Sequence, residues 1–186
     1  VSAWTVTNTA TGMATITWLL MSWAHTGKPS IVGAATGAVA GLVAITPASG
    51  WVGPMAAIII GIAAGTVCYG CVAFKNARKW DDALDVWGVH GMGGLTGAIL
   101  TGTLASPHIW DTGDGIGAWT GTPEGYEQQA ISIVAAGMSI AYAFGISIII
   151  FKIMDAVWPG GIRVTPKEEE IGLDLSQNGE RAYVNE

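Results

Sequence analysis

The chain has 186 residues; 51% of them are hydrophobic, only 12% are charged, and the formal net charge is −6 at pH 7. A soluble domain usually carries about 25% charged residues, so this composition argues against a soluble globular protein. The sequence contains no basic surface run, which argues against nucleic-acid binding. A membrane protein surrounded by a lipid bilayer is the class that the composition favours.

Hydropathy separates five apolar segments joined by charged or glycine- and proline-rich connectors. The stretch 30–74 contains no Asp, Glu, Lys or Arg. It fits two membrane spans and a turn, because about 20 residues cross a bilayer core. We therefore predict an all-α integral membrane fold, with a helical bundle over 1–158 and a cytoplasmic tail over 159–186. The predicted spans are 3–24, 31–48, 52–74, 86–105 and 128–151.

Glycines recur every four residues in the second and fourth predicted spans. They are Gly33, Gly37 and Gly41, and then Gly93 and Gly97. Small residues at this spacing let helix backbones approach closely in lipid. The spacing alone leaves two interpretations open: tight packing around a narrow path through the protein, or ordinary helix packing without a path.

The third predicted span contains Cys68 and Cys71 as a CxxC pair. A metal or redox role is one interpretation, but the chain has no second pair and no charged residue close by. Small side chains in a buried membrane helix are the better interpretation. We therefore predict neither a metal ion nor another cofactor.

The fourth predicted span places a histidine, His90, inside an apolar segment. A histidine in a membrane span is costly unless it faces protein or a polar cavity, so it is a functional candidate. A structural histidine with satisfied hydrogen bonds is the alternative, and the pattern does not separate the two. An imidazole can donate or accept a hydrogen bond and can relay a proton, so it suits a small polar ligand.

Three aspartates precede His90. Asp85 comes five residues earlier, about 7.5 Å along a helix axis, where a carboxylate would cap the N-terminus and interact well with the helix dipole. A role in attracting a cation or accepting a proton is the other interpretation of Asp85. Asp81 and Asp82 follow the basic residues Arg78 and Lys79, so we expect them to be solvated surface charges.

The basic residues predict the orientation in the membrane. All eight Lys and Arg fall on one side of the predicted bundle, and the connectors on the opposite side have none. Under the positive-inside rule the C-terminus is cytoplasmic and Val1 lies outside, which five spans also require. The residues are Lys28, Lys75, Arg78, Lys79, Lys152, Arg163, Lys167 and Arg181.

Three stretches carry a family resemblance. They read GKPSIVGAATGAVAGLVAITPASGWV at 27–52, DDALDVWGVHGMGGLTGAILTG at 81–102 and EEEIGLDLSQNGERAY at 168–183. In this order they resemble signature sequences of the Amt/Mep/Rh family of ammonium transporters. Family members have eleven helices, arranged as two inverted five-helix repeats and a final helix. The resemblance implies that this chain is the C-terminal half, the seventh to the eleventh helix with the cytoplasmic tail.

The resemblance also implies the residues of a pore. His90 matches the last histidine of the family motif DVxGVHG, Asp85 matches its first residue, and Val86 and Trp87 would help to shape the inner mouth. In the family two histidines line a narrow apolar pore, and the ammonium ion loses its proton on the way. An ion would be costly in a dry pore, whereas neutral ammonia can exchange hydrogen bonds with imidazole nitrogens.

The resemblance implies that part of the pore comes from residues that are not in this chain. The family's other pore histidine, its phenylalanine gate and its outer cation site come from the part that precedes Val1, so we interpret the chain as a fragment that cannot form the whole pathway alone. The resemblance further implies ammonium and its analogue methylammonium as substrates, a homotrimer in the plasma membrane, and a PII-type signalling protein at the cytoplasmic face.

The leading hypothesis is therefore ammonium or ammonia transport. An ammonium sensor that signals through its tail is the alternative, and the expected end at Glu186, without a kinase- or cyclase-like domain, disfavours it. An enzyme is disfavoured because no nucleophile–base pair or cluster of metal ligands is apparent, so no catalytic residue is predicted.

Overall fold

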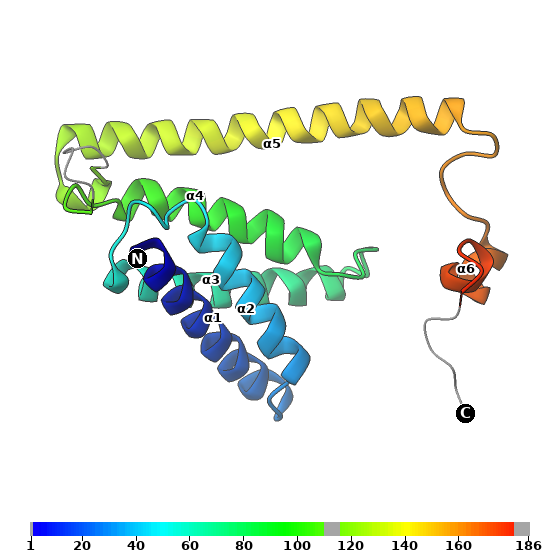
Figure 1. Ribbon diagram of the computed structural model, residues 1–186, viewed down its shortest axis with the longest axis horizontal. Helices are drawn as coiled ribbons and strands as arrows, with labels where there is room; N and C mark the ends of the chain where they lie inside the picture. Colours follow the sequence, from blue (N-terminus) through cyan, green and yellow to red (C-terminus); the bar gives the residue numbers. More distant parts are fainter. Residues whose placement is uncertain (1, 110–115, 181–186) are drawn as a thin grey trace. The chain divides into compact units, whose positions relative to one another are not determined.

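A computed structural model describes residues 2–109 and 116–180 (Figure 1). Throughout these ranges the regular structure is helical and no strand occurs, which confirms the all-α prediction. The chain divides into two compact units, Val1–Met138 and Ser139–Glu186, with the boundary inside one long helix. The helices are α1 (Ser2–Thr26), α2 (Ile31–Ile45), α3 (Pro54–Ala77), the π-helix η1 (Trp87–Gly91), α4 (Met92–Leu104), the 3-10 helix η2 (Ala118–Thr120), α5 (Pro123–Val157), α6 (Pro166–Ile171) and α7 (Leu173–Ser176).

Two of the described helices, α3 and α5, are long and apolar enough to cross a membrane by themselves. The helix α2 is apolar but shorter, and ends at Ile45, before the predicted boundary at 48. The helix α5 runs well beyond the predicted segment 128–151 at both ends. The number of membrane spans and the limits of the bundle therefore stay predictions.

The helix α1 packs on both α2 and α3, using a row of small side chains. Its buried residues recur every four positions, and glycines of the two neighbouring helices lie against them. A Cβ atom on Gly41 of α2 would lie 2.7 Å from the carbonyl oxygen of Ala10, and one on Gly61 of α3 would lie 2.5 Å from the same oxygen. Only glycine allows both backbones to come so close to α1. The buried row is Val6, Ala10, Ala14, Trp18 and Ser22.

The helix α4 meets α2 and α3 in the same way. A Cβ on Gly97 would overlap the carbonyl oxygen of Ala44 in α2, and one on Gly93 would lie 3.1 Å from the Sγ of Cys68 in α3. The close helix packing predicted from the glycine spacing is therefore confirmed. Whether a path runs between the helices is a separate question, to which the site below is relevant.

The second unit holds the two short helices of the tail. Thr165 caps α6: its hydroxyl accepts from the backbone N–H of Glu168, and the Glu168 carboxylate accepts from the backbone N–H of Thr165. Gln177 donates to the other oxygen of Glu168 at 2.9 Å, which ties α7 to α6. The hydrogen bonds from Thr165, first its side chain and then its backbone, hold the pKa of Glu168 below its usual range. Residues 181–186 of the predicted tail lie outside the described residues.

Close packing at Gly97 makes a stability prediction. Gly97→Ala should destabilise the fold by about 1–3 kcal/mol, because the new methyl group has no room beside the Ala44 carbonyl. Thermal unfolding in detergent measures the effect. Gly94→Ala is the matched control in the same helix, since its Cβ would meet only Val43 at 3.9 Å. Equal melting temperatures for the two variants would contradict the packing argument.

Candidate functional site

The histidine singled out by the sequence, His90, lies on a widened turn. The π-helix η1 precedes α4, and the backbone N–H of Met92 reaches the carbonyl oxygen of Trp87, five residues back. Such turns are rare within helices and are frequent at functional sites, because they change the direction in which the following side chains point. Hydropathy and helical periodicity gave no sign of this turn.

The side chain of His90 is exposed at the edge of a hollow of about 270 Å³. The opposite wall belongs to α2, and apolar side chains make up most of the lining. Within the described ranges no hydrogen-bond partner reaches the imidazole. The result is one imidazole, able to donate and accept, on an apolar wall. The residues beside it are Val32, Ala35, Thr36, Val39, Leu84 and Val89.

The side chain of Asp85 does not cap the helix, which was one of the two roles that the sequence suggested. Its carboxylate pairs with the Nζ of Lys75 at 2.5 Å, and the Lys75 side chain is only 6% exposed. The same Nζ donates to the backbone oxygen of Asp82 at 2.6 Å. From the sequence, Lys75 is expected only as one of the cations of the connector. Lys75 follows Val72 by three residues and Cys68 by seven, so the three share one face of a helix. This spacing indicates that the Lys75 side chain could point toward the protein interior.

Asp82, and not Asp85, caps the helix that carries His90. Its two carboxylate oxygens accept from the backbone N–H groups of Val86 and Trp87, each at 2.9 Å. Asp82 lies near the surface, as expected, but it also has a capping role that the expectation did not include. Partial burial alone would raise the pKa of Asp82, but the hydrogen bonds from Trp87 and Val86 and the charge of Lys75 together lower it. An aspartate directly before a helix start is the usual cap signal, and it pointed to Asp85; Asp82 lies four residues before Val86, so that signal did not identify it.

Val86 and Trp87 do not line the hollow. The indole of Trp87 instead packs near Trp80, with 5.1 Å between ring centroids, and near Phe74, at 6.3 Å. The guanidinium of Arg78 lies 5.2 Å from the centre of the Phe74 ring. Val86 is half exposed. Of the four predicted site residues, only His90 borders the hollow, and Asp85 supports the turn from the other side.

Sequence comparison supplies independent information about the chain. The family described as the Ammonium Transporter Family matches residues 1–183. Ammonium transporter Amt1 of Archaeoglobus fulgidus is 41% identical over 99% of this chain and 45% of its own length. An ammonium transporter of Bacillus subtilis is 42% identical over 95% of this chain and 43% of its own length. The chain thus spans less than half the length of these relatives.

Solved structures resemble the chain as well. The crystal structure of Mep2 from Candida albicans is 36% identical and has a TM-score of 0.81, covering 95% of this chain and 39% of that one. A structure described as a sensor Amt protein is 27% identical, with a TM-score of 0.76 over 95% of this chain and 41% of that one. The fold is therefore that of these helical membrane proteins.

The cap at Asp82 makes a pH-dependent prediction. Asp82→Ala should lower the melting temperature at neutral pH, because two backbone N–H groups lose their acceptor. Asp82→Asn keeps one acceptor oxygen and should lose less. Because the folded protein lowers this pKa, the stabilisation is present above the unfolded value of about 3.9 and is lost as the pH falls through the folded value. The gap between wild type and Asp82→Ala should therefore close on acidification; a gap that is unchanged down to pH 3 would argue against the cap.

Proposed function

Because this chain belongs to the ammonium transporter family, we propose that the protein containing it moves ammonium across a membrane through a pore lined by His90. The observation that carries the proposal is the position of the imidazole of DVWGVHG, presented on a π-turn beside an apolar hollow. The whole pore, its substrates and its partners are parts of the proposal, since the chain covers less than half of its relatives.

The chemistry of the hollow suits ammonia better than an ion. A cation that enters an apolar space without a counter-charge loses its hydration at high cost, and K⁺ and Na⁺ have no proton to give up. Ammonium can transfer its proton to water or to the imidazole of His90 and pass as ammonia, which needs only a hydrogen-bond partner on the way. Among the described residues that line the hollow, His90 offers both a donor and an acceptor nitrogen. Val86, Trp87 and Asp85 act at the inner end of this route in our proposal.

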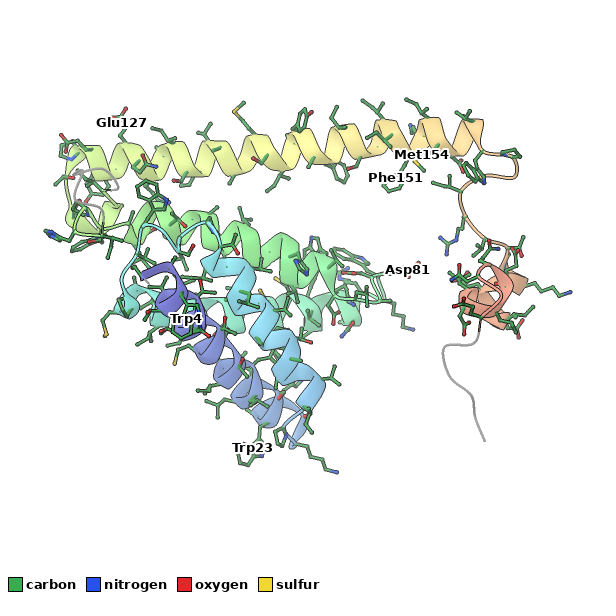
Figure 2. The ribbon with its side chains drawn as sticks, in the orientation of Figure 1. Trp4, Trp23, Asp81, Glu127, Phe151 and Met154 are labelled. Carbon is green, nitrogen blue, oxygen red and sulfur yellow. The ribbon has the colours of Figure 1, made fainter. Side chains whose placement is uncertain are left out.

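We further propose that the five predicted spans all cross the membrane as the seventh to eleventh helices of an eleven-helix inverted repeat. The helix α1 is rich in threonine, but hydroxyls of Thr9, Thr11 and Thr15 each donate to a backbone oxygen one turn back, which lowers their cost in lipid. Trp4 and Trp23 lie near the two ends of α1 (Figure 2). Their separation of about 28 Å along a helix matches the thickness of a bilayer core, and indole prefers its edges.

The remaining parts of the proposal rest on the family resemblance. They are a second pore histidine, a phenylalanine gate and an outer cation site in the rest of a longer protein, and a homotrimer that contacts a PII-type protein in the cytoplasm. Transport is favoured over sensing because relatives named as transporters are 41% and 42% identical, whereas the sensor Amt structure is 27% identical.

Orientation can be tested with single cysteines. In a variant without Cys68 and Cys71, a cysteine at position 106 (Ser106→Cys) should react with an impermeant maleimide from outside, and one at 176 (Ser176→Cys) from the cytoplasm. The reason is that the predicted spans place every Lys and Arg on the side of the tail. Labelling of both positions in permeabilised cells is the control for reactivity. Labelling of both from the same side would refute the topology.

His90 itself can be tested in the full-length protein. His90→Leu should lower the ratio of NH4⁺ to K⁺ transport by about tenfold, the effect of about 1.4 kcal/mol from one lost hydrogen bond in the pore. His90→Glu retains a proton acceptor but adds a charge, so it should admit more K⁺ than His90→Leu does. Uptake or current measured for each cation at matched protein levels decides the matter. An unchanged ratio of NH4⁺ to K⁺ transport in both variants would indicate that His90 has only a structural role.

A further inference from the structure

We propose that Lys75 is a positioning residue for His90: through Asp85 it holds the π-turn in the orientation that presents the imidazole to the hollow. The inference deepens the proposed function and rests on it, because it concerns what Lys75 does for the pore. The cation lies in the last turn of α3, where its long side chain has the reach to extend to water. It turns inward instead.

Three residues on one face of α3 hold three successive parts of the turn. They are spaced four and three residues apart, which is the spacing of one helix face. Cys68 lies with its Sγ 3.8 Å from the backbone oxygen of Val89. Val72 leaves no room for a side chain at Gly88, whose Cβ would lie 2.8 Å from a Val72 methyl carbon. Lys75 pairs with Asp85, and so forms the polar end of the same row.

Lys75 is buried, which is unusual for a lysine in a charged connector at the end of a helix. Only 4% of Lys75 is exposed, and a buried ammonium is costly unless charged or polar partners surround it. Its partners are the carboxylate of Asp85 and the backbone oxygen of Asp82, both on the segment that leads into η1. Lys79, in the same connector, is exposed and shows that a lysine there has access to water. Burying Lys75 therefore serves the segment that it binds.

Asp85 is the residue through which the tie acts on the backbone. Its φ is +56°, a left-handed conformation that is uncommon for a residue other than glycine and must be held by its surroundings. Its backbone oxygen accepts the first helical hydrogen bond, from the N–H of Val89 at 2.9 Å. A change of conformation at Asp85 would therefore redirect the turn that ends at His90, even while α3 and α4 stay folded.

A buried ion pair also stabilises a fold without any role in a pore, so stability alone does not test the proposal. The two roles differ in one respect. If Lys75 acts through the imidazole, its removal has no further effect on ion selectivity once the imidazole is gone. If it acts only on the fold, its removal changes selectivity by the same factor with or without His90, because independent effects add.

The experiment is a double-mutant cycle in the full-length transporter. Lys75→Met, His90→Leu and the double variant are compared with wild type for NH4⁺ against K⁺ transport, at matched amounts of folded protein in the membrane. Lys75→Met alone should lower the ratio by about tenfold, the loss of one charge-assisted hydrogen bond, and should have no further effect in the His90→Leu background. Lys79→Met is the matched control and should leave the ratio unchanged. Lys75→Arg keeps the charge and should restore most of it.

Each outcome decides between the two roles. An effect of Lys75→Met that multiplies with that of His90→Leu, or a wild-type ratio in Lys75→Met, would overturn the positioning role while leaving the pore proposal intact. An unchanged ratio in His90→Leu would instead refute the pore proposal itself. Should Lys75→Met fail to accumulate as folded protein, Lys75→Gln replaces it in the same cycle, because its amide removes the charge that pairs with Asp85 and keeps a donor for the Asp82 backbone oxygen. Additivity of Lys75→Gln with His90→Leu would equally overturn the inference.

Discussion

Backbone contact between helices at glycine is the constraint on which the first unit depends. In a bilayer, burial of apolar side chains gives little preference for protein over lipid, so helices associate through close packing and hydrogen bonds. Here glycines of α2 and α3 lie against the same carbonyl oxygen of Ala10, and Gly97 of α4 lies against that of Ala44. Larger residues at these points would separate the helices and remove the contacts of their neighbours.

The candidate site depends on this packing. With α2, α3 and α4 held close, one face of α3 contacts the π-turn directly, and α2 forms the opposite wall of the hollow beside His90. Two carboxylates lie at the start of the turn. Asp82 satisfies the free N–H groups at its start, and Asp85 ties it to Lys75. A polar cluster thus fixes the position of a residue that faces an apolar space.

Within a few residues of sequence, this arrangement keeps the charged groups that hold the backbone apart from the uncharged hollow beside His90. At the base of the helix Lys75 pairs with Asp85, and the carboxylate of Asp82 accepts from two backbone N–H groups, so these fixed charges lie on the backbone that leads into the turn. The hollow itself carries an uncharged wall and an imidazole. A carboxylate in the hollow would attract cations of every kind, whereas the observed lining suits a molecule that can shed its charge as a proton.

Much of the protein follows from the sequence by itself. Long apolar segments separated by charged connectors predict helices, because every backbone polar group in lipid must be bonded within its own segment. The DVWGVHG motif with its flanking stretches predicts the family, and the structure confirms both the helical class and the close packing at Gly41 and Gly97. These inferences succeed because hydropathy, residue size and short motifs are local properties.

Only the tertiary structure decided how the residues around His90 divide their work. The sequence predicted for Asp85 either a cap or a role with a cation or proton, and predicted no cap at Asp82, whereas in the structure Asp82 is the cap and Asp85 pairs with the buried Lys75. The structure also turned Lys75 inward and widened the turn at Trp87. Local sequence rules do not supply the pairing of Lys75 with Asp85, because it depends on contact between α3 and a residue ten positions later, and on a left-handed backbone at Asp85 that its surroundings must hold.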